Sequence, residues 1–141
     1  MGERVTVQVE HENLDPNLLL EKLIVSNSGA IVSFTGLTRG HENGIKVHSL
    51  DFDAWEEQLP NVLRDLGNKS LTQFGVESVA IAHRVGNVGP EEPIVAIHVA
   101  SRHRKEAFQA CSWLIDSLKS QAPLWKKENR EDGTHWKEGL G

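Results

Sequence analysis

The chain has 141 residues, of which 38% are hydrophobic and 25% charged, with a formal net charge of −5. This composition excludes a disordered chain, and no segment approaches the roughly 20 apolar residues of a membrane span. Cys111 is the only cysteine, which excludes an internal disulfide, a CxxC redox pair and a cysteine zinc cluster. We expect a single domain over residues 1–141 and a cytoplasmic location, since Met1–Val5 opens no apolar signal peptide.

Four segments in the first half of the chain carry strand or helix patterns. They are a strand over residues 4–10, a helix from Asp15-Pro16 to Ser28-Gly29, a strand over 30–35 and a strand over 45–52. The first strand is predicted because Val5, Val7 and Val9 alternate with polar residues. A polar loop, residues 36–44, separates the last two strands and contains Arg39. Loops at strand ends often bind ligands, so this loop is a candidate site.

The second half continues the alternation of helices and strands. Its predicted elements are a helix from Trp55 to Phe74, strands over 79–85 and 94–100 joined by a turn over 86–92, a helix from Ser101 to Ala122-Pro123, and short strands over 124–128 and 134–137. The order β-α-β-β-α-β-β-α-β-β predicts an α+β fold with an antiparallel or mixed sheet, because neighbouring strands often lack a helix between them. Neither GxGxxG nor GxxxxGK(S/T) occurs, which argues against a Rossmann or P-loop protein.

Basic residues are concentrated at the C-terminal end of the chain. Residues 1–101 carry 7 lysines and arginines against 14 aspartates and glutamates, whereas residues 102–141 carry 8 against 6. His103 and Arg104 stand where a strand ends and a helix begins, and there the free backbone N–H groups and the helix dipole favour an anion. The alternative is that these cations are only solvated residues of the first helical turn. We favour an anionic ligand near this end.

Three other kinds of site receive less support. His98 and His103 are the histidines nearest the basic end, but no third ligand lies in register with them, which argues against a metal site. Cys111 falls on an apolar helix face, where a buried thiol is the usual occupant, so we do not expect a catalytic cysteine. Asp51 and Asp53 share one strand face and form either an acid pair or a solvated strand edge, of which the second is favoured.

Five motifs follow one another along the chain. They are Phe34-Thr35-Gly36-Leu37-Thr38-Arg39, His83-Arg84-Val85-Gly86, Ser101-Arg102-His103-Arg104-x-x-Ala107-Phe108, Ile115-Asp116-x-Leu118-Lys119 and Ala122-Pro123-x-Trp125-Lys126-Lys127-Glu128. In that order they resemble the family of molybdopterin synthase large (catalytic) subunits. The resemblance extends from about Gly29 to Glu138. One departure is the turn Gly89–Pro93, where the family often has a glycine-acid turn.

The resemblance implies an α/β-hammerhead fold and sulfur transfer in molybdenum-cofactor biosynthesis. Members of the family convert cyclic pyranopterin monophosphate (precursor Z) into the dithiolene molybdopterin. The sulfur arrives as a thiocarboxylate on the Gly-Gly tail of a small ubiquitin-like subunit, which forms a heterotetramer with a homodimer of the large subunit. No metal and no resident cofactor are implied.

The same motifs imply the site residues. Lys119 and Lys126 are implied as the catalytic lysines. The implied substrate-binding residues are Leu37, Thr38, Arg39, His103, Arg104, Lys119, Lys126, Lys127 and Glu128. A phosphorylated pterin and an anionic thiocarboxylate both require cations, which agrees with the basic end of the chain.

The spacing of these residues predicts a homodimer. His103 and Lys119 lie 16 residues apart in one predicted helix. At about 1.5 Å per residue the separation is roughly 24 Å, too far for one small ligand. A two-fold axis that sets two such helices antiparallel brings His103 and Arg104 of one copy towards Lys119 of the other. Charge alone fits equally well a non-catalytic phosphate- or nucleotide-binding module, which stays open as the alternative.

Overall fold

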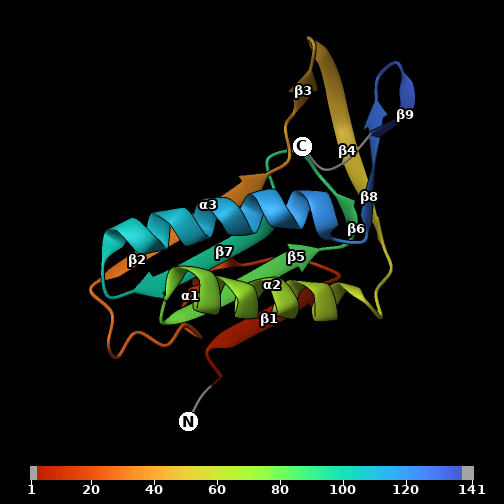
Figure 1. The fold of residues 1–141 in the computed structure, drawn as a ribbon. Helices are drawn as coiled ribbons and strands as arrows, with labels where there is room; N and C mark the ends of the chain where they lie inside the picture. Colours follow the sequence, from red (N-terminus) through yellow and green to blue (C-terminus); the bar gives the residue numbers. More distant parts are fainter. Residues whose placement is uncertain (1–2, 138–141) are drawn as a thin grey trace.

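The computed structural model describes residues 3–137, which form two β-sheets and three helices (Figure 1). In chain order the elements are β1 (Val5–Glu10), α1 (Pro16–Leu20), β2 (Ala30–Leu37), β3 (His41–Glu42), β4 (Ile45–Ala54), α2 (Leu59–Phe74), β5 (Ser78–Arg84), β6 (Gly86–Val88), β7 (Pro93–Ser101), α3 (Arg104–Gln121), β8 (Leu124–Arg130) and β9 (Gly133–Lys137). Among the described residues, no helix is long and apolar enough to cross a bilayer.

The main sheet has the strand order β1-β5-β7-β2 and is mixed. β1 runs parallel to β5, whereas β5 and β2 both run antiparallel to β7. Helices α2 and α3 lie side by side over one face of the sheet (Figure 1), and α1 packs on β5 and β7. All seven residues of β5 are buried, because this central strand is covered on both faces.

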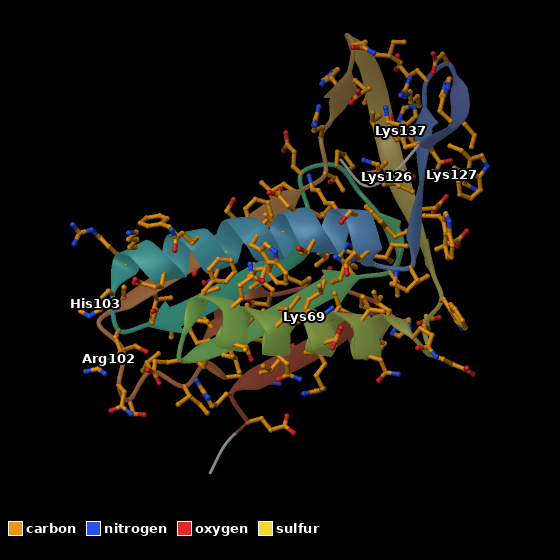
Figure 2. The ribbon with its side chains drawn as sticks, in the orientation of Figure 1. Lys69, Arg102, His103, Lys126, Lys127 and Lys137 are labelled. Atoms are coloured by element: carbon orange, nitrogen blue, oxygen red, sulfur yellow. The ribbon has the colours of Figure 1, made fainter. Side chains whose placement is uncertain are left out.

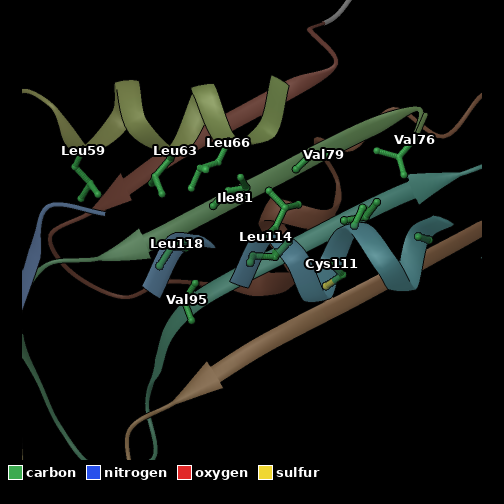
Figure 3. Close-up of a cluster of buried hydrophobic side chains, with 14 of the residues drawn as sticks. Leu59, Leu63, Leu66, Val76, Val79, Ile81, Val95, Cys111, Leu114 and Leu118 are labelled. Carbon is green, nitrogen blue, oxygen red and sulfur yellow. The ribbon is translucent and has the colours of Figure 1, made fainter. Parts of the chain in front are cut away.

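The main hydrophobic core lies between this sheet and helices α2 and α3 (Figure 3). Leu59, Leu63 and Leu66 recur at helical spacing on α2, and each is at most 1% exposed. Leu114 and Leu118 face them from α3. Burying a leucine side chain stabilises a fold by about 1.5–3 kcal/mol, so these residues fix both helices on the sheet.

The ends of the helices follow from local sequence. Pro60 lies in the first turn of α2, where a missing backbone N–H breaks no helical hydrogen bond. Gly75 ends α2 in the left-handed region, with φ at 68°, and its N–H donates to the Leu71 carbonyl. Pro123 follows α3 and prevents its continuation, so the chain turns directly from Ala122 into β8.

The second sheet has the order β3-β4-β8-β9, and β6 also pairs with β4. It projects beyond the end of α3, away from the main sheet (Figure 1). A small core supports it, made of Val47, Leu50, Phe52 and Val88. β8 and β9 form an antiparallel hairpin in which Lys126 pairs with Lys137 and Glu128 with His135. Since β8 follows α3 immediately, the hairpin lies beside the C-terminal turn of that helix.

The predicted α+β class, the mixed sheet and the C-terminal hairpin are confirmed. Two short strands were missed: β3 lies inside the predicted loop 36–44, and β6 inside the predicted turn 86–92. The helix predicted to continue to Ser28-Gly29 ends at Leu20, because Lys22 and Leu23 donate to Leu19 and Leu20 in tight turns. The second helix starts at Leu59 instead of Trp55, after a turn.

Candidate active site

A cavity of about 310 Å³ opens where the main sheet meets the β8–β9 hairpin. Its walls come from the end of β2 and the loop after it, from the last turn of α3, and from β8 and β9. Six charged side chains line it: Arg39, Glu42, Lys119, Lys126, Glu128 and Lys137. Four cations against two carboxylates give the lining a net positive charge, which favours an anionic ligand.

One wall of the cavity is apolar. Phe34 and Leu37 contribute to it from β2, and Val47, Leu50 and Ile94 from neighbouring strands. Leu37 is 56% exposed, an unusual position for a leucine unless a ligand or a partner covers it. An apolar wall opposite a group of cations suits a ligand that has a flat ring at one end and a negative charge at the other.

Lys126 lies on β8, half-buried among other charges. Burial lowers the pKa of its ammonium group. Glu128 opposes this effect, whereas the nearby cations Lys137, Arg39 and Lys119 add to it. A lysine with a lowered pKa is deprotonated more readily and then serves as a base or a nucleophile.

Lys119 lies in the last turn of α3 and is exposed to the cavity. A cation is favoured there by the negative end of the helix dipole. Because Pro123 ends the helix a few residues later, the β8 strand turns back and places Lys126 in the same cavity. The two lysines implied as catalytic are therefore brought together by the junction between α3 and β8.

Glu128 is the most deeply buried charge of the cavity, with only 5% of its side chain exposed. Its Oε2 accepts a hydrogen bond from Arg130 Nε at 2.7 Å, and its Oε1 lies 3.6 Å from Lys137 Nζ. A buried carboxylate requires such partners, since an unpaired one is costly. Glu128 thus holds the positive side chains of the hairpin around the cavity.

Thr38 is 3% exposed and fastens the loop after β2 to the turn between β6 and β7. Its hydroxyl donates to the Gly89 carbonyl at 2.5 Å and accepts from the Glu92 N–H at 3.1 Å. Its backbone N–H donates to the Glu92 carbonyl, and its carbonyl accepts from the Glu91 N–H. Leu37 and Arg39 on either side of Thr38 therefore have a fixed backbone. The turn in which the sequence departs from the family pattern is the partner of this loop.

His103 and Arg104 lie at the other end of α3, outside the cavity. Figure 2 shows His103 far from Lys126, with the length of the helix between them. His103 is the N-cap residue, has no side-chain capping hydrogen bond, and is exposed, as is Arg104. Within one copy of the chain these two residues do not join the other site residues.

Lys127 points to the opposite face of the hairpin from Lys126, as successive strand residues do. Its Nζ lies 3.6 Å from Asp51 Oδ2 and 5.5 Å from the centre of the Trp136 ring. Hydrogen bonds from Asn129 and Asn87 hold the pKa of Asp51 below its usual value. Asp51 is thus a paired carboxylate, and Lys127 lines a different surface from the cavity.

Glu42 and Lys137 line the cavity but were not among the predicted site residues. For Lys137 a signal existed: residues directly opposite in an antiparallel hairpin point to the same face, and Lys137 pairs with Lys126. The hairpin was predicted, but its register was not. Glu42 belongs to the short strand β3, which the sequence pattern did not reveal.

Cys111 and His98, the other candidate functional residues of the sequence analysis, are explained by burial and by hydrogen bonding within the fold. Cys111 is 5% exposed, and burial raises the pKa of its thiol to about 11, which disfavours the reactive thiolate. The two ring nitrogens of His98 contact Ser33 Oγ at 2.6 Å and the Pro16 carbonyl at 2.8 Å. Among residues 3–137, no three or more His, Cys, Asp or Glu side chains are grouped as metal ligands would be.

The fold and the cavity define a small α+β protein with a site for an anionic ligand. The sequence profile of the MoaE protein family matches residues 9–121, and the chain belongs to this family. One relative, the molybdopterin synthase catalytic subunit of Thermoplasma volcanium, is 33% identical over 127 residues, which cover 90% of this chain and 93% of the relative.

Two solved structures have the same fold. Molybdopterin synthase from Staphylococcus aureus is similar with a TM-score of 0.87 and 31% identity, covering 92% of this chain and 95% of that one. A protein–protein complex of subunits 1 and 2 of molybdopterin-converting factor from Helicobacter pylori contains a chain with a TM-score of 0.77 and 24% identity, covering 94% of this chain and 90% of that one.

Proposed function

We propose that this chain is the catalytic subunit of a molybdopterin synthase and transfers sulfur to cyclic pyranopterin monophosphate. The curated relative of Thermoplasma volcanium carries this name and is covered almost completely. One structural observation carries the proposal for the site: six of the nine implied site residues line a single cavity. They are Leu37, Thr38, Arg39, Lys119, Lys126 and Glu128.

The cavity supplies what the two substrates need. The pterin ring system packs on the apolar wall at Phe34 and Leu37, while the anionic groups are held by the cations opposite. Arg39, on the loop fixed by Thr38, provides a guanidinium for a phosphate or a carboxylate. In each transfer one sulfur leaves the thiocarboxylate for a carbon of the pterin, and water supplies the oxygen that returns the donor terminus to a carboxylate.

The two lysines divide the chemistry. Lys126, whose pKa is lowered, is the group that takes up or returns a proton during sulfur transfer. Lys119, exposed to the cavity at the end of α3, stabilises the negative charge that develops on the carbonyl oxygen of the donor. Both roles require the donor terminus to enter between the last turn of α3 and the β8 strand.

The sulfur donor in this proposal is a small ubiquitin-like subunit with a Gly-Gly tail. The Helicobacter pylori neighbour is a complex of two subunits, which supports a partner of this kind. A glycine tail suits the cavity because its backbone approaches the walls closely, and its charged terminus gains hydrogen bonds from lysines in a partly desolvated site. Cys111 is buried and offers no sulfur of its own.

The proposal includes a homodimer whose two copies build each site together. His103 and Arg104 lie about 24 Å along α3 from Lys119, which one small ligand does not span. The β2 strand provides a place for a second copy. Its outer edge has no strand partner among residues 3–137, and the strand carries no charged residue. Such edges are usually covered, because they pair readily with other chains.

Exposed apolar residues on the same side of the molecule support this placement. Arg104, Phe108, Ile115 and Lys119 recur at helical spacing and share one side of α3. Phe108 is 61% exposed, and Ile31 on β2 is 48% exposed. A two-fold axis along this side sets α3 antiparallel to its copy and brings His103 and Arg104 of one copy to the cavity of the other.

A non-catalytic phosphate- or nucleotide-binding module is not favoured. The relatives at this level of identity are named as catalytic subunits.

The proposal is tested by mixing the protein with the pterin precursor and one of three donors: a thiocarboxylated small subunit, the same subunit with an ordinary carboxylate, or inorganic sulfide. We expect efficient dithiolene formation with the thiocarboxylate alone. Lys119→Ala should reduce turnover about 100-fold or more with a native-like melting curve, as the loss of an oxyanion contact does. The matched control is Lys69→Ala, an exposed lysine on α2 (Figure 2), which should retain full turnover. Equal rates with sulfide, or an unchanged Lys119→Ala enzyme, would contradict the proposal.

A further inference from the structure

The carboxylate of Glu42 lies between two cations of the cavity. Its Oε2 is 3.7 Å from Arg39 Nη1, and its Oε1 is 3.5 Å from Lys137 Nζ. Each carboxylate oxygen thus faces one cation, which is the arrangement that a bound phosphate or carboxylate would adopt at the same place. The three residues come from separate parts of the site: the loop after β2, the short strand β3 and the last described position of β9.

The contact of Glu42 with Lys137 is more enclosed than an ordinary surface ion pair, whereas the Arg39 side chain is 75% exposed. The side chain of Glu42 is 20% exposed and that of Lys137 is 27% exposed. Lys137 also approaches Glu128 Oε1 at 3.6 Å and is directly opposite Lys126 in the hairpin. Without a negative charge between them, Arg39 and Lys137 would repel each other and Lys126. Glu42 therefore offsets the repulsion between these cations while no ligand is bound.

We infer that Arg39 and Lys137 form an anion subsite that Glu42 occupies in the free protein, and that an anionic group of the ligand displaces the Glu42 carboxylate. The inference deepens the proposed function, on which it rests for the identity of the natural ligand. The chemical class is set by the subsite: a phosphate or carboxylate group that accepts hydrogen bonds from a guanidinium and an ammonium group.

Displacement of Glu42 requires little disruption of the fold. β3 contains two residues, and it pairs with β4 through His41 with Lys46 and Glu42 with Ile45. Asn43 and Gly44 form the connecting turn, both with positive φ. Rotation of the Glu42 side chain away from the cavity leaves these backbone pairs intact.

An internal carboxylate at this position confers selectivity. A free phosphate ion must compete with the Glu42 carboxylate for Arg39 and Lys137, and it makes no further contacts that would favour its binding. A ligand that also packs on the apolar wall of the cavity has additional contacts with which to outcompete Glu42. Glu42 thereby weakens the binding of small anions to the subsite more than it weakens the binding of the larger ligand.

The test is the affinity of the purified chain for inorganic phosphate, measured by isothermal titration calorimetry. Glu42→Gln keeps the size of the side chain and removes its charge. It should bind phosphate about three- to ten-fold more tightly, as expected when two partly exposed ion pairs no longer compete. The matched control is Glu131→Gln, an exposed residue in the β8–β9 turn that makes the same change in net charge outside the cavity. Its affinity should equal that of the wild type.

A double variant tests whether the tighter phosphate binding of Glu42→Gln takes place at this subsite. In Glu42→Gln/Lys137→Gln, where half of the subsite is missing, the tighter binding should disappear. The inference is overturned if Glu42→Gln binds phosphate no more tightly than Glu131→Gln, or if the gain persists undiminished in the double variant. Thermal melts of all variants show whether the chains are folded. The proposed function is tested by a separate measurement. It fails if the wild-type protein forms no dithiolene, whatever its affinity for phosphate.

Discussion

Lys126 lies half-buried beside Glu128 and among three other cations, Lys137, Arg39 and Lys119. Burial, the largest cause, and the three cations lower the pKa of its ammonium group, whereas Glu128 raises it. If the neutral amine is the active form, turnover should rise with pH through this lowered pKa. The environment of Lys126 therefore makes the pH profile of the reaction informative about the identity of the base.

Lys137→Gln should shift the rising part of the pH profile to higher pH. Removing a like charge next to Lys126 makes its protonated form less unfavourable, so its pKa increases towards the ordinary lysine value. The measurement is kcat against pH for wild type and variant at saturating precursor. A profile that does not move, or moves to lower pH, would argue that Lys126 is not the titrating base.

His83 should make stability depend on pH. Its side chain is 2% exposed, and burial lowers its pKa from 6.5 to about 4. Because the pKa is lower in the folded state than in the unfolded state, the contribution of His83 is fully present above about pH 6.5 and is lost as the pH falls towards about 4. Between about pH 7 and about pH 5 this loss amounts to about 2 kcal/mol.

Urea unfolding at these two pH values checks this prediction. His83→Gln should reduce the pH-dependent loss of unfolding free energy by about 2 kcal/mol, whereas His48→Gln, at an exposed position, should leave it unchanged. Equal pH dependence in wild type and His83→Gln would show that His83 is not buried in its neutral form.

Six of the nine predicted site residues line one cavity, and for the two lysines the local sequence explains why. Lys119 and Lys126 fall in a shared cavity because Ala122-Pro123 forces a turn between helix and strand, and that turn was predicted. Lys127 was predicted as a neighbour of the substrate, but strand alternation places it on the opposite face from Lys126. The position of Glu42 depends on contacts with residues distant in sequence, so no local pattern indicated it.

At the scale of elements, the loop after β2 and the turn before β7 act as one unit joined at Thr38. Thr38→Val preserves the shape of the side chain but removes both hydroxyl hydrogen bonds and leaves the Gly89 carbonyl and the Glu92 N–H without their partner. We expect KM for the precursor to rise about ten-fold, because only the backbone hydrogen bonds of Thr38 then fix the position of Arg39, and stability to fall by about 1–3 kcal/mol.

Thr38→Ser is the matched control for this change. It retains the hydroxyl and should keep KM close to that of the wild type. If the valine and serine variants have the same KM, the hydroxyl does not position the loop. Steady-state kinetics with the thiocarboxylated donor at saturation measures this difference directly.

Element-level prediction failed where pairing partners are distant. β6 exists because Leu50 and Phe52 of β4 pair with Val88 and Gly86, a contact that turn residues alone do not reveal. β3 is joined to β4 by a two-residue turn at Asn43-Gly44, a recognised hairpin signal, but β3 itself has only two residues, too few for a periodic pattern. The long helices and central strands were predicted correctly because each buries a regular apolar face.

At the scale of the whole molecule, the cavity of a single copy contains the lysines but lacks His103 and Arg104. In the proposed homodimer a second copy would supply them on the side of Phe108 and of the β2 edge, which has no strand partner among residues 3–137. A site shared between two copies differs from a site within one chain in one testable way. Two inactive variants, each defective in a different half of the site, regain activity when they form a mixed dimer.

The most direct measurement is therefore complementation between Lys119→Ala and Arg104→Ala. Each variant alone should form little dithiolene at low precursor concentration, the first because it lacks the lysine proposed to be catalytic and the second because it should bind the precursor weakly. When the two are co-expressed, half of the dimers are mixed, and each mixed dimer has one site with both native residues. We predict recovery of about one quarter of the wild-type activity. Activity no greater than the average of the two separate variants would contradict a sulfur-transfer site built from two copies of this chain.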